Sequence, residues 1–307
     1  MSQKRVIKIN DSDNVAIAIN EIPAGTKAAD GVFANRNIPQ GHKIALCDIP
    51  EGGEIRRYGV VLGYALSGIK KGDWINEHML QLPVLPELDD MAFGTNLVSD
   101  LPQAPVKTFD GYRNPNGGYA GTRNILGIST TVQCVTGVLN VAVKRMREEL
   151  LPKYPNVDGI VPINHAYGCG VAINAPEARV PIRALRNLVR HPNFGGEVMV
   201  VALGCEKLTV EMLLGSGDIK PENVIVLQDK SGFQAMMDVI MEMAGRKLKR
   251  LNARKRETLP LSDLCIGMQC GGSDAFSGVT ANPSAGYAAD LLVQAGATVL
   301  FSEVTEV

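Results

Sequence analysis

The chain has 307 residues, enough for about two domains, and its 45% of hydrophobic residues can fill ordinary cores. A formal net charge of −1 gives no general attraction to nucleic acid, and no stretch approaches the roughly 18 apolar residues of a membrane helix. The first ten residues, MSQKRVIKIN, lack the apolar core of a signal peptide, and six cysteines are too few for a secreted disulfide scaffold, so we expect a cytoplasmic protein with thiols and without a membrane partner.

Residues 1–80 are expected to form a small all-β domain. The segments RVIKIN and NVAIAIN flank an Asp-Ser-Asp turn, an arrangement that is typical of a hairpin. A four-residue motif then recurs as IPAG, IPQG and IPEG, with IKKG as a looser copy. Proline at its second position and glycine at its fourth indicate a type I turn. Repeated turns between short apolar runs predict a compact β-rich module.

Residues 81–118 are interpreted as an extended linker, because five of the seventeen prolines fall there without apolar periodicity. Residues 119–307 are predicted to form an α/β domain, in which apolar runs alternate with helical patterns. Such alternation indicates a mostly parallel sheet with right-handed crossovers. The predicted strands are NILGISTTVQC, GIVPINHAYGC, VMVVALGC, NVIVLQD, LCIGMQC and ATVLFSE.

Four of these strands end in cysteine. The carboxyl ends of parallel strands lie along one edge of the sheet, where ligands bind, so the thiols are expected along one rim. For a single cysteine, the simpler interpretation is a small buried apolar residue. The four residues are Cys134, Cys169, Cys205 and Cys270.

The stretch MQCGGSDAFSGVTANP, residues 268–283, leads from a predicted strand into a predicted helix. Asn282 is a plausible helix cap and Pro283 suits a first turn, so free backbone N–H groups there would favour an anion. Asp274 would repel an anion and suits a metal, a substrate hydroxyl or proton transfer better. The alternative is a tight turn whose polar residues only cap the backbone.

Other polar residues occur close to predicted strands. His165, in NHAYGCG, follows a strand and is the natural proton carrier near neutral pH, although a lone histidine is usually structural. Glu206 follows the next cysteine, and Arg123 has the fork that matches a carboxylate. In the β-rich module, His42 and Lys43 begin a strand.

Neither a dinucleotide fingerprint nor a Walker A lysine motif occurs, so no nucleotide cofactor is expected. The run Arg246–Arg256 has seven cations in eleven residues, but it lacks interleaved aromatics. It is interpreted as a solvated helix face and not as a nucleic-acid site.

Several motifs closely resemble the galactarate/altronate dehydratase family, and within it the galactarate branch. They are DNVAIAIN, IPQGHKIALCDI, NVDGIVPINHAYGCGVAINAP, HPNFGGEVMVVALGCEKL and GMQCGGSDAFSGVTANP. The resemblance implies an N-terminal SAF-type β-clip domain and a carbon–oxygen lyase that dehydrates galactarate to 5-dehydro-4-deoxy-D-glucarate with a divalent metal, Fe²⁺. Family members continue for about another domain's length, so the sequence is interpreted as an N-terminal fragment with an incomplete catalytic region.

Dehydration of a sugar diacid needs a base for the proton next to a carboxylate, an acid for the leaving hydroxyl, and a cation for the enolate charge. From the matching motifs, the catalytic candidates are His165, His42, Asp274 and Glu206. Lys43 and Arg123 are expected to bind substrate carboxylates, and Ser273, Ser277, Thr280 and Asn282 its hydroxyls. The candidate metal ligands are His42, His165, Cys169, Cys205 and Cys270.

Three alternatives stay open. In the first, the four strand-end cysteines are the ligands of an iron–sulfur cluster, although no two of them are closely spaced. A relative acting on altronate or another 2-hydroxy acid, including sulfolactate, would share the fold. The chain is otherwise an inactive substrate-binding fragment. A homodimer is the working expectation for its assembly.

Overall fold

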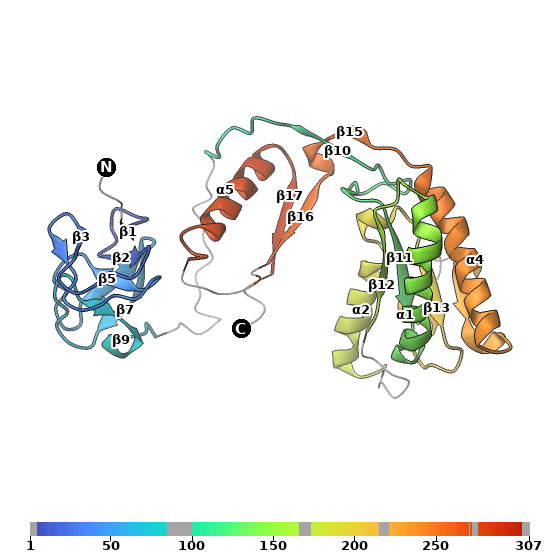
Figure 1. Cartoon of the computed structure of the whole chain (residues 1–307), viewed down its shortest axis with the longest axis horizontal. Coiled ribbons are helices and arrows are strands. Elements are labelled where there is room, and N and C mark those ends of the chain that lie inside the picture. The colour runs from blue at the N-terminus through green and yellow to red at the C-terminus, as the bar shows by residue number, and fades with distance from the viewer. Residues whose placement is uncertain are drawn as a thin grey trace. The chain divides into compact units, whose positions relative to one another are not determined.

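The computed structural model describes residues 5–84, 100–165, 173–214, 221–269, 271 and 276–302 (Figure 1). The chain divides into two compact units. The first comprises Met1–Pro102, Met268–Leu291 and Phe301–Val307, and the second comprises Gln103–Gly267 and Leu292–Leu300. None of the described helices is both long enough and apolar enough to cross a membrane.

The N-terminal residues form the predicted β-rich module from short antiparallel strands. A four-stranded sheet has the order β1 (Val6–Ile7), β2 (Val15–Ala18), β5 (Lys43–Ala45), β8 (Trp74–Ile75). A three-stranded sheet has the order β6 (Glu54–Arg57), β7 (Val60–Ala65), β9 (Leu80–Gln81), and β3 (Lys27–Ala29) pairs with β4 (Val32–Phe33). A single 3₁₀ turn, Glu77–Met79, precedes β9. Two apolar clusters, one on each side of β2 and β5, form the core.

The four repeated turns build this core together. Their first residues are buried isoleucines, which pair in two antiparallel bridges, Ile22 with Ile38 and Ile49 with Ile69. The turn starts one residue later than predicted, at the proline and not at the isoleucine, so the predicted type I turn is wrong. In the second repeat, the turn hydrogen bond runs from the N–H of His42 to the carbonyl of Pro39, 3.1 Å away. Gly41 is therefore the third turn residue, with φ +78°, and a type II turn requires a positive φ at that position.

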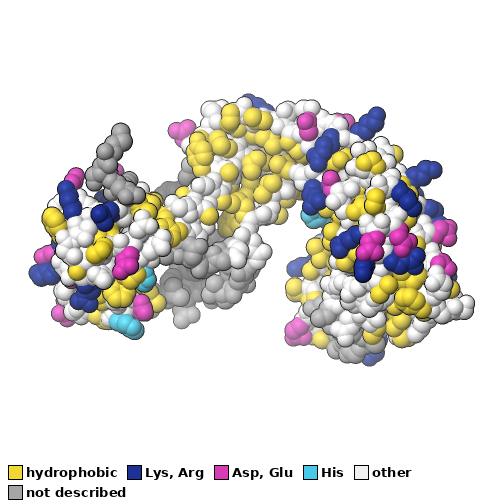
Figure 2. Space-filling view, in the orientation of Figure 1, with side chains coloured by type: hydrophobic (Ala, Val, Ile, Leu, Met, Phe, Trp, Pro, Cys, Tyr) yellow, Lys and Arg dark blue, Asp and Glu magenta, His cyan; other side chains and the backbone are white. Residues whose placement is uncertain are grey.

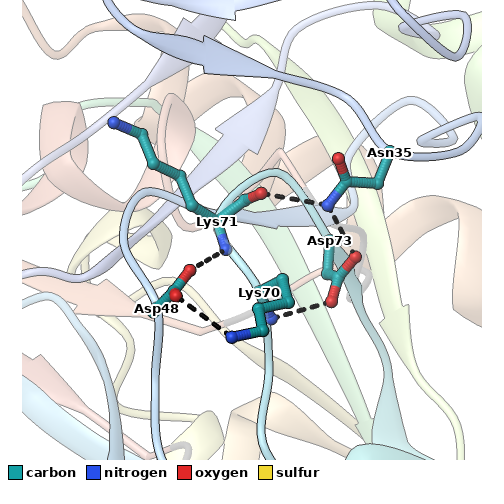
Figure 3. Close-up of polar contacts among 5 residues, drawn as sticks. All are labelled: Asn35, Asp48, Lys70, Lys71 and Asp73. Atoms are coloured by element: carbon teal, nitrogen blue, oxygen red, sulfur yellow. Dashed lines mark hydrogen bonds and ion pairs between the residues drawn. The ribbon is translucent and has the colours of Figure 1, made fainter.

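The fourth repeat lacks proline, and side chains hold its turn instead (Figure 3). Asp48 accepts hydrogen bonds from the backbone N–H of Lys71 (2.8 Å) and the ammonium of Lys70 (3.3 Å). Asp73 accepts from the backbone N–H of Lys70 (2.8 Å), and Asn35 donates to both Asp73 (2.9 Å) and the carbonyl of Lys71 (3.0 Å). These contacts fix a turn that the sequence alone specifies only weakly.

The second unit contains the predicted parallel sheet. Its four strands have the order β12 (Gly159–Ile163), β11 (Ile125–Thr130), β13 (Met199–Ala202), β14 (Val224–Val226), and every pair is parallel. On one face lie α1 (Thr136–Arg145), which continues as a π-helix over Met146–Leu150, and α4 (Phe233–Asn252). On the other face lie α2 (Arg179–Leu188) and α3 (Val210–Leu214). Helices on both faces explain why these strands are continuous apolar runs.

Short 3₁₀ turns connect these elements. They are Gln133–Val135, Leu151–Lys153, Pro176–Ala178, Pro192–Phe194, Pro221–Asn223, Leu227–Asp229 and Leu261–Asp263. A separate antiparallel pair joins β10 (Thr108–Gly111) to β15 (Glu257–Pro260).

The last two predicted strands do not join the parallel sheet, contrary to expectation. β16 (Cys265–Met268) and β17 (Thr298–Phe301) form a two-stranded sheet of their own, with α5 (Ala281–Gln294) between them in sequence. The strand before Cys270 therefore does not share the carboxyl edge of the parallel sheet with the strands that precede Cys134 and Cys205. A short apolar run predicts a buried strand but does not say which sheet it enters.

Candidate functional site

The carboxyl edge of the parallel sheet brings three polar segments together. Thr130 ends strand β11 and Thr131 follows it, His165 follows β12, and Glu206 follows β13. Because β12 and β13 are the two neighbours of β11, their end loops flank the same pair of threonines. The sequence placed His165 and Glu206 at this edge correctly, but it gave no role to the threonines.

His165 contacts the end of β11. Its Nε2 lies 3.1 Å from the carbonyl oxygen of Thr130. A carbonyl only accepts hydrogen bonds, so Nε2 carries the proton in this contact and the acceptor lone pair of the neutral ring is on Nδ1. Burial lowers the pKa of His165, and this outweighs the opposing effect of the Thr130 contact. The ring is therefore biased toward the neutral form that a general base needs.

Glu206 is held as a hydrogen-bond acceptor. Its Oε1 accepts from the hydroxyl of Thr131 (2.5 Å) and the N–H of Leu203 (3.2 Å), and its Oε2 accepts from the N–H of Gly204 (2.5 Å). Burial alone would raise the pKa of Glu206, but these hydrogen bonds outweigh it and the net pKa is lowered. An ionised carboxylate can accept a proton but not supply one at neutral pH, and both oxygens of Glu206 hold the loop that follows β13.

Arg123 does not reach this edge. It precedes β11, and its Nη2 donates to the carbonyl of Asp158, 3.1 Å away, just before β12 begins. This contact lies at the amino edge of the sheet, opposite His165. The expectation that Arg123 joins His165 around one substrate is therefore wrong, because the two residues sit at opposite ends of adjacent parallel strands.

His42 and Lys43 belong to the β-rich module. His42 is exposed, and its Nδ1 accepts a hydrogen bond from the indole N–H of Trp74 at 3.1 Å, with the rings edge to face. Lys43 is half-buried, and its pKa is lowered by burial first and by the charge of Arg57 second, with Glu77 opposing. Lys43 is thus a poorly solvated cation.

The loop before α5 is only partly described. Ser273, Asp274 and Cys270 lie outside the described residues, as does Cys169. The hydroxyl of Thr280 donates to the carbonyl of Phe276 (2.8 Å), which matches the alternative of a capped turn. The N–H of Asn282 donates to the carbonyl of Ser277 (2.7 Å), and α5 begins one residue earlier, at Ala281. Asn282 therefore lies in the first helical turn and not at the cap.

The described donors do not form a metal site. No three histidine, cysteine, aspartate or glutamate side chains come together within the described ranges. Cys134 and Cys205 are exposed thiols, and His165 and Glu206 are engaged by backbone and hydroxyl groups. No chemical step is therefore assigned here to a metal, and the remaining predicted thiol ligands, Cys169 and Cys270, are outside the described part of the chain.

The basic run is less solvated than predicted. Lys247, in α4, is only 1% exposed, and its ammonium lies 2.9 Å from the carboxylate of Glu197. Arg254 and Arg256 lie beyond the end of α4, and both stack over the ring of Tyr112. The expectation that the whole run is a solvated helix face is therefore wrong for the buried Lys247.

The fold thus combines a β-rich module with an α/β layer whose strand ends gather a titratable histidine and buried acceptors. Comparison with known families shows what this combination is. The chain belongs to the galactarate/altronate dehydratase family. Three models of that family match it, namely the altronate/galactarate dehydratase SAF domain over residues 4–83, the D-galactarate dehydratase/altronate hydrolase second domain over 111–252, and the D-galactarate/altronate dehydratase C-terminal domain over 261–307.

Curated relatives agree with these matches. The galactarate dehydratase (L-threo-forming) of Escherichia coli strain K12 is 55% identical over 98% of this chain and 59% of its own length. The altronate dehydratase of the same strain is 35% identical, over 98% of this chain and 60% of its own length. The beta subunit of (2R)-sulfolactate sulfo-lyase from Chromohalobacter salexigens is 26% identical over 65% of this chain and 47% of that subunit. The chain spans about three-fifths of the length of the first two relatives.

Proposed function

We propose that this chain acts on galactarate as a hydro-lyase and forms 5-dehydro-4-deoxy-D-glucarate. The observation that carries the proposal is the difference in identity, 55% to a galactarate dehydratase against 35% to altronate dehydratases of two organisms. The same distribution of identity weighs against altronate or sulfolactate as the main substrate. A panel of galactarate, altronate and sulfolactate tests this choice.

The proposed reaction removes the proton on the carbon next to one carboxylate and the hydroxyl on the following carbon. The C–H electron pair forms the double bond, the C–O bond breaks, and water leaves. The enol product then becomes the 2-oxo acid by proton transfer. His165 is the proposed base, because burial favours its neutral ring and its Nε2 is oriented by the Thr130 carbonyl. Glu206 and Thr131 support this role by holding the adjacent loop.

The test is turnover of galactarate after His165→Gln, with His191→Gln as a matched control. Burial also lowers the pKa of His191, but that residue lies in the turn that precedes β13, at the amino edge of the sheet. We expect His165→Gln to lower kcat by a factor of about 10²–10⁴, the usual contribution of a general base. Wild-type turnover in His165→Gln would exclude this residue as the base.

The pH profile tests the same role independently. A base with a lowered pKa is neutral, and so competent, above that pKa, and it loses activity as acid protonates it. We expect kcat/KM to be constant through neutral pH and to fall only below the ordinary histidine value of about 6.5. An acid limb above that value would contradict the assignment.

The ferrous ion that the family resemblance implies would have to draw ligands from outside the described residues. Turnover with added ferrous ion and after chelator treatment tests this expectation. Calorimetry with galactarate distinguishes an active chain from one that only binds the substrate.

A further inference from the structure

The hairpin between β6 and β7 has an unusual tip. Its two loop residues are Tyr58, with φ +58°, and Gly59, with φ +76°. Two positive φ values are typical of a type I′ turn, which normally has asparagine or aspartate at the first position. Tyr58 is the only residue other than glycine with a positive φ in the described part of the chain. A bulky residue in this conformation costs about 1–3 kcal/mol, and such strain is often found at functional sites.

A buried carboxylate holds the strained tip in place. Asp13 is only 5% exposed, and its Oδ1 accepts a hydrogen bond from the N–H of Gly59 at 2.8 Å. Its Oδ2 accepts from the N–H of Asn10 at 2.9 Å. The side chain of Asp13 thus ties the tip to a loop 46 residues away in sequence, and the tip has a fixed position from which to present its neighbours.

The tip presents the guanidinium of Arg57. Its Nη2 donates to the hydroxyl of Tyr58 at 2.6 Å, and its central carbon lies 4.4 Å from the centre of the Tyr58 ring. Its Nε is buried and has no hydrogen-bond partner among the described residues. A buried guanidinium donor without an acceptor raises the free energy of the folded state. An acceptor atom of a ligand at the Nε of Arg57 would remove this cost.

A second cation lies close to Arg57. The charge of Arg57 disfavours protonation of the half-buried Lys43, so the two groups interact. Neither residue forms an ion pair within the described ranges. Glu54 pairs with Arg56, and the charge of Glu77 acts on Lys43 more weakly than that of Arg57. Because neither cation forms an ion pair with a described carboxylate, an anion would be stabilised beside them.

The segment before α5 faces this cation pair. A Cβ atom at Gly278 would lie 2.3 Å from the hydroxyl oxygen of Tyr58 and 3.4 Å from Nη2 of Arg57. Only glycine allows the backbone to come so close. Both segments belong to the same compact unit, and Gly278 lies in the SGVT part of the loop that the sequence singled out for substrate hydroxyls.

We propose that Arg57 and Lys43 together bind one carboxylate of the sugar diacid beside Gly278, and that Tyr58 orients the guanidinium for this contact. The planar fork of a guanidinium matches a carboxylate, and the lysine adds a second charge. The inference rests on the proposed function and deepens it, because it assigns a substrate carboxylate to a residue that sequence motifs did not suggest.

The experiment measures galactarate binding by calorimetry, and KM and kcat, for four variants. Arg57→Gln removes the charge and Arg57→Lys keeps it without the fork, while Tyr58→Phe removes only the hydroxyl. Arg56→Gln is the matched control, because Arg56 lies next to Arg57 on β6 and pairs with Glu54. Circular dichroism and thermal unfolding confirm that each variant is folded.

We expect Arg57→Gln to weaken galactarate binding about 10- to 100-fold, mainly through KM, as loss of a charge-assisted hydrogen bond does. The affinity of Arg57→Lys for galactarate should lie between those of Arg57→Gln and the wild type. Tyr58→Phe should weaken galactarate binding about threefold to tenfold, and Arg56→Gln should change it less than about twofold. Arg57→Gln should also bind galactarate no better than galactonate, which has a single carboxylate.

The outcomes separate the inference from the proposed function. If the wild type dehydrates galactarate but Arg57→Gln or Arg57→Lys binds it as Arg56→Gln does, the carboxylate site is wrong and the dehydratase function stands. If the wild type neither binds nor converts any sugar diacid, the proposed function fails and the carboxylate assignment fails with it.

Discussion

Helices α4 and α5 both carry many apolar side chains, but only α4 is packed. Seven residues of α4 are buried, including Met237, Ile240 and Leu248, whereas none of the 14 residues of α5 is. Figure 2 shows hydrophobic side chains on the surface over α5, β16 and β17. Tyr287 of α5 is 59% exposed and Phe301 of β17 is 75% exposed.

The difference follows from what each helix packs against. α4 lies on a four-stranded sheet and shares a large core with α1. The chain on either side of α5 forms only the two-stranded sheet of β16 and β17, and the nearby cluster has three buried apolar residues, Leu261, Leu264 and Ala297, none of which belongs to α5. A two-stranded sheet offers too little surface to bury a 14-residue helix. The same kind of apolar pattern therefore contributes unequally to stability in the two regions.

The largest expected effect in this comparison comes from the buried charge of α4. Glu197→Gln should lower the free energy of unfolding by about 3–5 kcal/mol, because it leaves the ammonium of Lys247 buried without its partner. Lys247→Met should cost much less, because Glu197 keeps a contact with Arg250 at 3.4 Å. Urea unfolding measures both variants. Equal losses would mean that the buried pair is not what makes α4 sensitive.

Truncation of apolar side chains compares the two helices directly. Leu248→Ala should cost about 2–5 kcal/mol, because the side chain is fully buried in α4. Val293→Ala should cost about 0.5 kcal/mol or less, because that residue of α5 is 46% exposed. Chemical denaturation measures the loss of unfolding free energy in each of the two variants. A cost above 2 kcal/mol for Val293→Ala would show that α5 is covered after all.

A smaller effect is expected at the rim of the packed sheet. The lowered pKa of Glu206 means that its hydrogen bonds stabilise the fold above the unfolded-state pKa and are lost as pH falls through the folded-state pKa. Glu206→Gln should cost about 1–2 kcal/mol at neutral pH and nearly nothing in acid. Exposed Glu211, on α3, is the control, and Glu211→Gln should leave the pH dependence of stability unchanged. A Glu206→Gln loss that does not depend on pH would contradict this account.

The smallest effect is expected at the surface of the β-rich module. Lys70→Ala should change stability by about 0.5 kcal/mol or less, because its ion pair with Asp48 is exposed. Asp48→Ala should lower the unfolding temperature more than Lys70→Ala does, since Asp48 also accepts from the backbone of Lys71. Thermal unfolding of the two variants checks the order. The reverse order would show that the ion pair, and not the backbone contact, holds this turn.

Local sequence patterns predicted much of this fold. The repeated turns indicated the β-rich module, and the alternation of apolar runs with helical spacing indicated the parallel sheet. The same patterns placed β16 and β17 in the wrong sheet, because a short apolar run does not encode its partner. Arg123 was misplaced because its residue type suggested a carboxylate site, whereas its position before β11 decides which edge it occupies.

The site could be predicted only where its parts follow a strand. His165 and Glu206 do, and the structure places both at the carboxyl edge. The role proposed for Arg57 has no signal in the local sequence, since it depends on Asp13 behind the hairpin tip and Gly278 in front of it. No pattern within a short window connects residues so distant in the chain.

The two isoleucine bridges make the β-rich module a pair of similar halves. One half closes through Ile22 and Ile38 and the other through Ile49 and Ile69, each with its own turn hydrogen bonds. The halves are joined where Asn35, which lies between Ile22 and Ile38, donates to Asp73 and to the carbonyl of Lys71 in the fourth turn. A change of loop length around Asn35 would therefore loosen a turn of the other half, whereas a change at a hairpin tip away from this contact leaves both isoleucine bridges in place.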